Sequence, residues 1–269
     1  MPRADMDELM KLEISLPPLS EQSRIARILK EQMAAVERAR RSAEAQLQAA
    51  EALPAAYLRS VFNSPEAQQW PKERLSELCD VKGGKRLPVG ADFANRVTQF
   101  PYIRVVDFQN GGVNLDGLKY LDERTQREIA RYIINRDDVF ISIAGSIGIV
   151  GVIPDALNGA NLTENAARLV IKDRNVLFRD FLARFLTSPL GREQIDQRTN
   201  KVGQPKLAIE RIATIEISFP AFSYQQRIAS QLSSQMASAE RLRQALADQL
   251  DAINKVPSAL LRRAFNGEL

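Results

Sequence analysis

The chain has 269 residues, a formal net charge of +4 and a sequence pI near 9.3. This length can bury a sizeable core, and the mild basicity permits a polyanionic partner without requiring one. A single cysteine, Cys79, and the absence of histidine exclude an internal disulfide framework, the usual zinc sites and a histidine-activated nucleophile. We expect Cys79 to be a small buried residue and the chain to hold no metal.

Cofactor, catalytic and targeting signatures are missing from the sequence. The KGGKR segment at 82–86 lacks the spacing of a P-loop, and GSIG at 145–148 is not a G-x-S-x-G nucleophile motif. No apolar run reaches membrane-spanning length, and the N-terminal residues lack the apolar core of a signal peptide. These observations predict a cytoplasmic chain that is not an enzyme and binds no cofactor of its own.

Two stretches of the chain repeat each other without a gap. Residues 12–63 and 215–266 are identical at about half of their positions, and the long segment between them is unrelated to either. Repeats that stack directly on one another make solenoids. A repeat on either side of an insert instead favours two similar arms around one variable domain.

Each arm begins with an alternating, strand-like segment that ends in proline. Ser20 and Ser223 follow and are predicted to cap the first turn of a helix. The next residues are rich in Ala, Leu, Gln, Glu and Arg, and free of glycine and proline, which predicts long helices. Pro54 and Pro257 occupy equivalent places, where we expect each helix to kink or restart.

Within each arm, a seam of mostly apolar residues recurs at alternating steps of four and three, the pattern of a coiled coil. The alternative is an amphipathic helix on a globular core, but the polar flanks and the shared phase of both copies favour a coiled coil. An arginine interrupts both seams at the same place, where it could fix the register or extend its charge to the edge. The seam residues are Leu29, Met33, Val36, Arg40, Ala43, Leu47 and Ala50, and then Leu232, Met236, Ala239, Arg243, Leu246, Leu250 and Ile253.

The sequence pattern of the insert, residues 64–214, is typical of a compact α/β domain. Glycine, asparagine and proline turns separate short β-like runs, and helices are expected at 122–132 and 178–198. The β-like runs lie at 102–106, 139–143, 149–153 and 167–171.

Four polar loops of this insert combine cations, amides and glycines, which suit phosphates and base edges. A single polar loop is usually only solvated, but four in one small domain make nucleic-acid binding as plausible as four solvated loops. The candidate DNA contacts are Lys82, Lys85, Arg86, Arg104, Gln109, Asn110, Asn161, Thr163, Asn165, Lys201, Gln204 and Lys206.

Several segments resemble the specificity (S) subunit of type I restriction–modification enzymes. The arms carry the strongest likeness, in LPPLSEQSRIA at 16–26 and LLRRAFNGEL at 260–269. Trp70 to Leu78 resembles the opening of a target-recognition domain. DDVFIS at 137–142, followed by GSIG, and GQPKL at 203–207 resemble its later motifs.

The resemblance implies an α+β fold, in which one globular α/β target-recognition domain is flanked by two long helices that form an antiparallel coiled coil. It implies a non-catalytic subunit that reads one half-site of double-stranded DNA. The helices would set the spacing and bind the modification (methyltransferase) subunits, which bring S-adenosylmethionine and methylate adenine. A restriction motor-nuclease subunit would join the complex, and two chains could form a symmetric homodimer.

The family pattern has two recognition domains, whereas this chain has one. Residues 6–16 match the segment that closes the insert at 209–219, as though they ended a missing first domain. Two other functions stay open: a coiled-coil adaptor whose central domain binds a protein or peptide, and a stand-alone DNA-binding regulator. The predicted parts are 1–19, the trailing segment of a missing domain; 20–63, the first arm; 64–214, the recognition domain; and 215–269, the closing segment and second arm.

Overall fold

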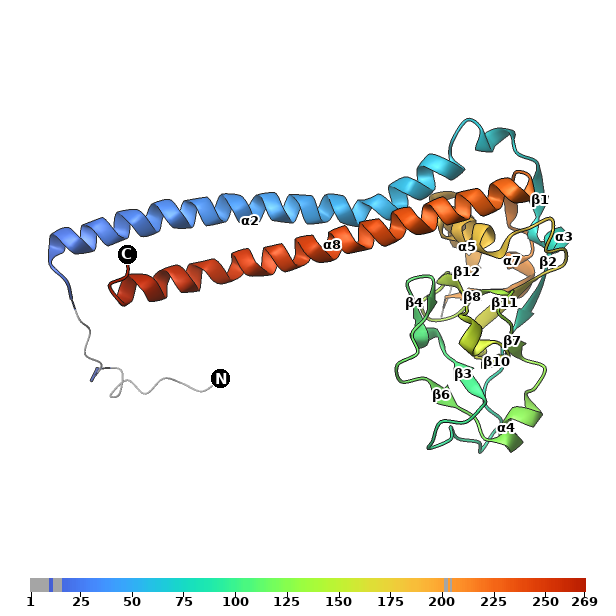
Figure 1. Cartoon of the computed structure of the whole chain (residues 1–269). Coiled ribbons are helices and arrows are strands. Elements are labelled where there is room, and N and C mark those ends of the chain that lie inside the picture. The colour runs from blue at the N-terminus through green and yellow to red at the C-terminus, as the bar shows by residue number, and fades with distance from the viewer. Residues whose placement is uncertain (1–9, 12–15, 201–202, 204) are drawn as a thin grey trace. The chain divides into compact units, whose positions relative to one another are not determined.

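The structure, a computed structural model, describes residues 10–11, 16–200, 203 and 205–269. The chain divides into two compact units: a helical unit of Met1–Ala52 with Ala239–Leu269, and a globular unit of Leu53–Ser238. Two long helices, α2 (Leu19–Phe62) and α8 (Phe222–Phe265), contribute residues to both units (Figure 1).

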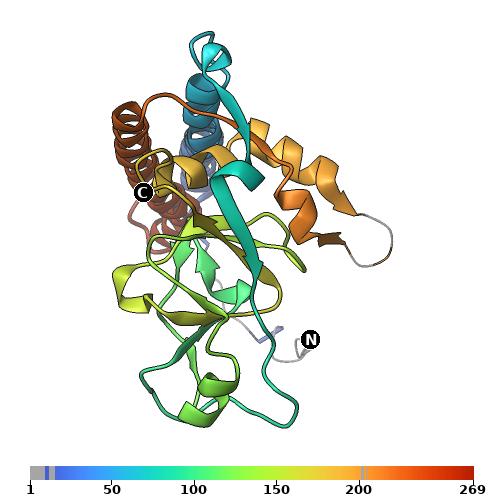
Figure 2. The ribbon, with the colours of Figure 1, turned by 90° about the vertical axis from the view of Figure 1, so that its right-hand side faces the viewer.

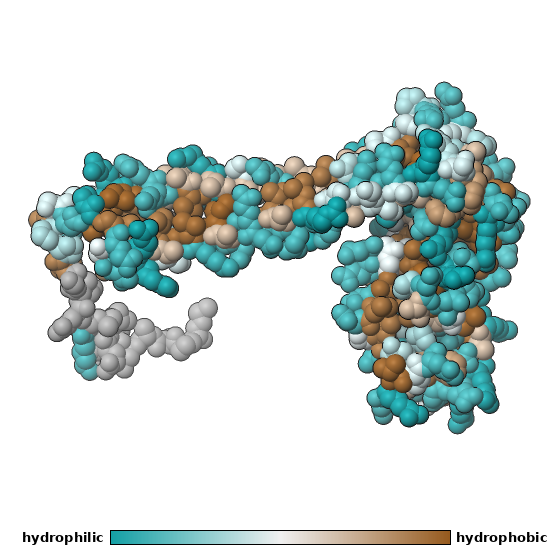
Figure 3. All heavy atoms as spheres, in the orientation of Figure 1, coloured by the Kyte–Doolittle hydropathy of each residue, from teal (hydrophilic) through white to brown (hydrophobic). Residues whose placement is uncertain are grey.

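In the helical unit, α2 and α8 lie side by side and run antiparallel (Figure 1). Arg24, near the start of α2, donates a hydrogen bond to the backbone oxygen of Leu269 at the end of the chain. Ala43, Ala239 and Leu246 are buried, and the other predicted seam residues of this unit are buried or half-buried. Leu232 and Met236 belong to the globular unit and pack in or against its core. Apolar atoms gather along the line where the two helices meet (Figure 3). The predicted antiparallel coiled coil is therefore confirmed.

The two seam arginines are held by glutamates of their own helices. Arg40 forms ion pairs with Glu37 at 2.8 Å and with Glu44 at 2.6 Å, and Arg243 pairs with Glu240 at 2.7 Å. Both guanidinium groups thus reach the edge of the seam. The sequence left two roles open for these arginines, and the structure shows the second: each extends its charge to the edge of the seam.

The helix starts differ from the sequence prediction. The amide of Glu21 donates to the Pro18 carbonyl and that of Tyr224 to the Ala221 carbonyl, both at 2.9 Å, so each first turn already includes its serine. Ser20 and Ser223 lie inside the helices and are not their N-caps. The prediction was wrong because the carbonyls that follow each strand-like segment accept the first helical hydrogen bonds.

Neither arm proline ends its helix. The helix α2 continues through Pro54 to Phe62, and α8 continues through Pro257 to Phe265. Proline removes one backbone hydrogen bond. Packing of the following turn can offset that loss, and Leu58 and Phe62 are indeed buried in the core of the globular unit. Of the two expected outcomes, a kink or a restart, the restart is therefore wrong.

The larger sheet of the globular unit has four antiparallel strands in the order β2-β11-β8-β9. Three of them coincide with predicted β-like runs, because alternating or continuous β-branched residues bury one or both faces. The strands are β2 (Cys79–Gly83), β11 (Ala166–Ile171), β8 (Val139–Ser142) and β9 (Val150–Val152).

A second sheet has the order β6-β3-β10-β7, and its central strands β3 and β10 are parallel. Parallel neighbours bring their carboxyl ends to the same edge of a sheet. This sheet and α4 (Glu123–Glu128) lie at the end of the globular unit remote from α5 (Figures 1 and 2). Its strands are β6 (Lys119–Tyr120), β3 (Pro101–Ile103), β10 (Ala160–Leu162) and β7 (Ile133–Ile134).

The predicted helix at 178–198 is two helices, α5 (Arg179–Thr187) and α6 (Pro189–Arg198). Pro189 disfavours a helical backbone at Ser188, whose hydroxyl then caps α6 by accepting from the Gly191 amide at 3.2 Å. The other elements are short: η1 (Ala67–Gln69), β1 (Lys72–Arg74), α3 (Leu75–Leu78), η2 (Val105–Asp107), β4 (Phe108–Gln109), β5 (Gly112–Val113), η3 (Asp155–Leu157), β12 (Thr199–Asn200), β13 (Lys206–Leu207), α7 (Ile209–Ile212) and β14 (Glu216–Ser218).

The main core of the globular unit includes the ends of both arms. Phe62 from α2 makes edge contacts with Phe181 and Phe185 of α5, with ring centroids 5.4 and 5.5 Å apart. Ile228 and Leu232 from α8 are buried in the same cluster. The compact unit therefore extends beyond the 64–214 boundaries expected from the sequence.

Candidate nucleic-acid interface

The parallel strands β3 and β10 bring two of the predicted loops together. Arg104 follows β3 directly, and Thr163, Glu164 and Asn165 follow β10. The Thr163 amide donates to the Ile103 carbonyl at 3.0 Å, which ties the two strand ends to each other.

A third loop, around Lys85, is joined to the same place by its backbone. The amide of Gly84 donates to the Ala166 carbonyl at 2.9 Å, and that of Lys85 donates to the Leu162 carbonyl at 2.8 Å. A side chain at Gly84 would overlap the backbone oxygens of Leu162 and Thr163, at the end of β10, so only glycine allows this approach.

The fourth loop, which contains Lys206, is joined to this edge by Ala144. The Asn165 carbonyl accepts from the amides of Ile143 and Ala144, and Ala144 forms a β-bridge with Lys206. The structure therefore brings together part of each predicted loop. We call this surface the recognition edge and define it as residues 82–87, 104–106, 163–165 and 206.

A hollow of about 400 Å³ lies in the recognition edge. Its walls are largely apolar, and its polar groups include two arginines, one glutamate and one asparagine. Such a mixture of apolar surface and a few fixed polar groups suits the flat edge of a ligand such as a nucleobase. The lining residues are Arg86, Leu87, Phe93, Tyr102, Arg104, Val105, Val106, Thr163, Glu164 and Asn165.

The cations of the edge differ in their partners. Arg86 forms an ion pair with Glu164 at 2.7 Å, and Arg104 pairs with the buried Asp107 at 2.7 Å. Lys85 and Lys206 form no ion pair with any described residue, although the Lys85 ammonium lies 5.8 Å from the centre of the Tyr132 ring. The two lysines are therefore the cations best placed to meet phosphates.

Glu164 is ionised at neutral pH. Burial raises the pKa of its carboxyl group, but hydrogen bonds from Arg86, from its own backbone amide and from Thr163 outweigh burial and leave the pKa below its usual value. The same contact raises the pKa of the Arg86 guanidinium. The pair thus keeps both charges.

Asn161 does not belong to this surface. Its side chain is only 1% exposed, and its Nδ2 donates to the Ile129 carbonyl at 2.9 Å, so the amide is not available to a base. We therefore remove Asn161 from the candidate contacts. Thr163 is also buried, and its hydroxyl donates to Glu164 at 2.9 Å, which makes it a support for that carboxylate.

The remaining candidates are placed as follows. Lys82 is exposed and lies 3.5 Å from the Asp80 carboxylate. Gln109 and Asn110 are exposed at the β4–β5 hairpin, where Asn110 adopts φ 52°, and the structure shows no hydrogen bond from their side chains to the described residues of the edge. Lys201 and Gln204 lie outside the described residues.

Sequence reasoning passed over Glu164, although both of its neighbours were candidates. An acidic residue is unexpected on a surface predicted to face a polyanion, so charge alone argued against it. Its position between Thr163 and Asn165 in the amide-rich loop was the available signal. The aromatic and aliphatic walls, such as Phe93 and Val106, had no distinguishing pattern in the sequence.

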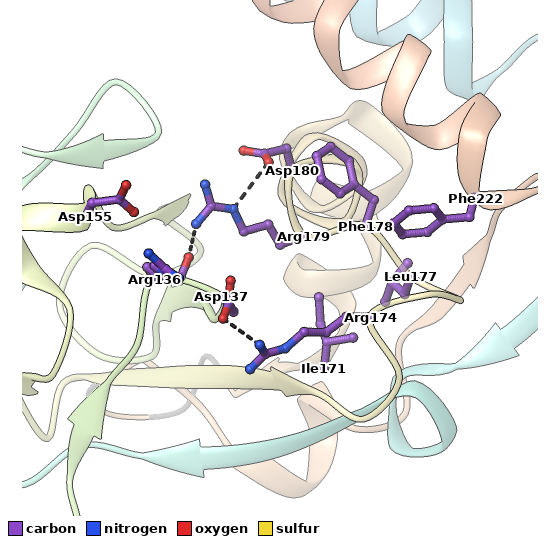
Figure 4. A pocket seen from close by; sticks show the side chains of 10 residues that line it. All are labelled: Arg136, Asp137, Asp155, Ile171, Arg174, Leu177, Phe178, Arg179, Asp180 and Phe222. Atoms are coloured by element: carbon purple, nitrogen blue, oxygen red, sulfur yellow. Dashed lines mark hydrogen bonds and ion pairs between the residues drawn. The ribbon is translucent and has the colours of Figure 1, made fainter.

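A separate cavity of about 430 Å³ lies near the N-terminal end of α5 (Figure 4). Three arginines and three aspartates line it, so its charges balance. Arg174 pairs with Asp137 at 2.7 Å, and Arg179 pairs with Asp180 at 3.3 Å while also donating to the Arg136 carbonyl. This balance suits phosphates less well than the recognition edge does.

Metal sites and membrane spans can be judged only over the part of the chain that the structure describes. No group of three or more acidic or cysteine side chains there could hold a metal ion. No helix in that part is long and apolar enough to cross a membrane.

The structure thus combines a long antiparallel helix pair with a globular unit that carries several cations and the Asn165 amide at one edge. Comparison with known proteins gives the family. Residues 67–251 match the type I restriction modification DNA specificity domain, and this match covers more than half of the sequence. The chain belongs to that family.

Two curated relatives are specificity subunits. The type I restriction enzyme EcoBI specificity subunit of Escherichia coli is 24% identical over 167 residues, which are 62% of this chain and 35% of the relative. The MjaVIII specificity subunit of Methanocaldococcus jannaschii is 21% identical in an alignment 258 residues long, which covers 87% of this chain and 57% of the relative. The chain thus spans about a third to three fifths of these relatives.

Two solved structures share the fold over the whole chain. A chain from a study of complex assembly and conformational transition of the type I R-M system has a TM-score of 0.80 at 23% identity, with 65% of that chain covered. The HsdS subunit from Thermoanaerobacter tengcongensis has a TM-score of 0.64 at 24% identity, with 64% of it covered. The predicted α+β fold with two flanking helices is confirmed.

Proposed function

We propose that this chain is a DNA sequence-recognition subunit of a type I restriction–modification complex, and that its recognition edge reads one half-site of double-stranded DNA. The observation that carries the proposal is the convergence of four polar loops on one edge of the globular unit. That edge combines Lys85 and Lys206, which suit phosphates, with an amide and a hollow that suit base edges. Family membership supports it.

In this proposal the chain performs no chemistry itself. Modification subunits dock on the helical unit, bring S-adenosylmethionine and methylate adenine, and a motor-nuclease subunit completes a complex that works in the cytoplasm. Exposed apolar side chains that flank the seam of α8 support the docking role. Leu242 and Val256 lie two heptads apart and are both exposed, so they occupy one stripe of the helix beside the seam.

Salt dependence tests the DNA-binding role. Each phosphate contact contributes a slope of about −0.9 to a plot of log K against log salt concentration. Replacing Lys85 and Lys206 together with alanine should flatten the slope by about two units. The measurement is a salt titration of duplex binding by the full chain, with and without its modification subunit.

A matched control for this titration is Lys72→Ala. Lys72 is an exposed cation on β1, outside the recognition edge, and its loss should leave the slope unchanged. Equal slopes for wild type and the Lys85/Lys206 variant would show that DNA does not lie on this edge.

We further propose that the end of the helical unit that holds Leu16 and Phe265 binds a second copy of the chain. The internal repeat supplies the argument, because equivalent residues differ sharply in exposure. Phe62 is 2% exposed in the globular unit, whereas its counterpart Phe265 is 83% exposed. Likewise Phe219 is buried, and its counterpart Leu16 is exposed. An apolar groove of about 480 Å³ that includes Leu16 and Phe265 lies at this end.

Burying these grooves against each other would give a symmetric dimer. Phe265→Ser should therefore raise the dimer dissociation constant by at least tenfold, since burying one phenylalanine is worth about 1.5–3 kcal/mol. Sedimentation equilibrium measures it, and Leu242→Ser, a similar change elsewhere on α8, serves as the control. A wild-type chain that stays monomeric at every concentration would refute this part of the proposal.

A further inference from the structure

Among the described residues that line the hollow of the recognition edge, Glu164 is the one carboxylate. It lies on the surface that should face phosphates, where an ionised carboxylate opposes binding through charge repulsion. A carboxylate on this surface favours binding only if the ligand donates a hydrogen bond to it. Cytosine and adenine offer one, because their amino groups donate hydrogen bonds in the major groove.

The geometry leaves both members of the Arg86–Glu164 pair with free bonding capacity. Arg86 uses its Nε to donate to Glu164 Oε1 at 2.7 Å, and within the described part of the chain its two terminal nitrogens make no hydrogen bond. Glu164 Oε2 accepts from the Thr163 hydroxyl at 2.9 Å. A carboxylate has about four lone-pair sites, so acceptor capacity remains on it.

The two side chains are held by segments that are joined to one another. The backbone before Arg86 is bonded to the strand before and after Glu164, through Lys85 to Leu162 and through Gly84 to Ala166. On the other side, Asn165 is bonded to the strand end at Ile143. The Arg86 side chain remains 78% exposed and that of Glu164 29% exposed, so the pair is fixed at its base and open to a ligand.

We propose that Arg86 and Glu164 act together as a reader of a G·C base pair in the major groove of the half-site. Guanine presents N7 and O6 as two neighbouring acceptors, which match the free terminal nitrogens of Arg86. The cytosine N4 amine of the same pair lies beside O6 and matches Glu164. An A·T pair presents a donor where O6 would be, so it does not accept the arginine fork. This inference rests on the proposed function.

The neutralised pair also explains a division of labour at the edge. Arg86 and Glu164 together add no net charge, so they contribute little to the attraction for phosphates. Lys85 and Lys206, which have no ion-pair partner among the described residues, supply that attraction instead. Substitutions of the pair should therefore change which bases are chosen, while substitutions of the lysines should change affinity for all sequences alike.

The test is selection of bound duplexes from a library with a randomised half-site. The full chain is used, alone and with its modification subunit. The variants are Arg86→Lys, which keeps the charge and removes the fork, and Glu164→Gln, which keeps the shape and removes the carboxylate. Lys85→Ala is the matched control, and thermal melting checks that each variant is folded.

Wild type should select a G·C pair at one position of the half-site. Arg86→Lys and Glu164→Gln should each reduce the preference at that position by about tenfold to a hundredfold, the range expected for a specific base contact. Neither should alter the other positions, and Lys85→Ala should leave every preference intact while weakening binding.

The possible failures are distinguishable. Selective binding whose preferences survive both substitutions would overturn the inference and leave the proposed function standing. An effect of the two substitutions at an A·T position instead of a G·C position would do the same. A wild-type chain that enriches no sequence in either form would overturn the proposed function, and the inference with it.

Discussion

At the scale of single residues, burial decides the chemistry of the lone thiol. Cys79 is 2% exposed at the start of β2, and burial raises its pKa to about 12. Because the thiolate is the reactive form, the native protein should react with Ellman's reagent far more slowly than the unfolded chain. A stopped-flow comparison in buffer and in denaturant measures this, and equal rates would contradict the buried placement.

Amides show why residue type alone does not identify a contact. Asn161 and Asn165 lie in the same loop sequence, and both have the donors and acceptors that adenine needs. The pairing of β10 with β3 and β7 turns Asn161 into the core, where its amide bonds a backbone carbonyl, and the chain leaves the sheet before Asn165, which is exposed. The end of β10 at Leu162 makes this difference, because a longer strand would have put both amides on the same face, and strand ends are poorly defined by sequence.

At the scale of elements, the paired arms are the most regular part of the chain. Their alternating four- and three-residue spacing is a local pattern that depends on no distant contact, which is why the sequence predicted them well. The short strands of the insert were partly predictable for the same reason. The second sheet was not, because β6, β7 and β10 are two or three residues long and exist only through pairing.

We expect charged substitutions in the seam to lower the stability of the helix pair. Leu47→Asp together with Leu250→Asp places charges in the half-buried line between α2 and α8. Burying polar groups without partners costs about 1–3 kcal/mol each, so helicity and melting temperature should both fall clearly. Far-UV circular dichroism during heating is the measurement.

The matched control for this change is Ala49→Asp together with Ala252→Asp. Both alanines lie on exposed faces of the same helices, so the same charges are added outside the seam. This variant should melt close to wild type. If the two double variants melted alike, the coiled coil would not depend on the seam.

At the scale of the whole molecule, the helices and the recognition edge should have separable effects on DNA choice. Inserting seven residues after Ala45 and after Asp248 preserves the seam, because seven residues restore its 3.5-residue period. The helix pair would lengthen by about 10 Å, or about three base pairs of duplex. In an assembly with two recognition domains, the gap between half-sites should grow while each half-site stays the same.

Methylome mapping of cells that express the lengthened chain with its modification subunit measures both quantities. The Glu164→Gln variant is the complementary case, since it should alter a half-site and leave the gap unchanged. A change in the bases read after the heptad insertion would contradict the separation of spacing from reading.

The sequence by itself determined the repeat, the two long helices, their shared seam and the resemblance to specificity subunits, because these rest on local periodicity and on contiguous motifs. Tertiary structure alone decided which polar residues form a surface. Residues around 84, 104, 164 and 206 are far apart in the chain. They meet because β3 and β10 run parallel, because the glycine at 84 allows a close backbone approach, and because Ala144 bridges Lys206 to the segment at Asn165. The same pairing buried Asn161 and exposed the Arg86–Glu164 pair, since a hydrogen-bond register, unlike a periodic pattern, is set by contacts between distant segments.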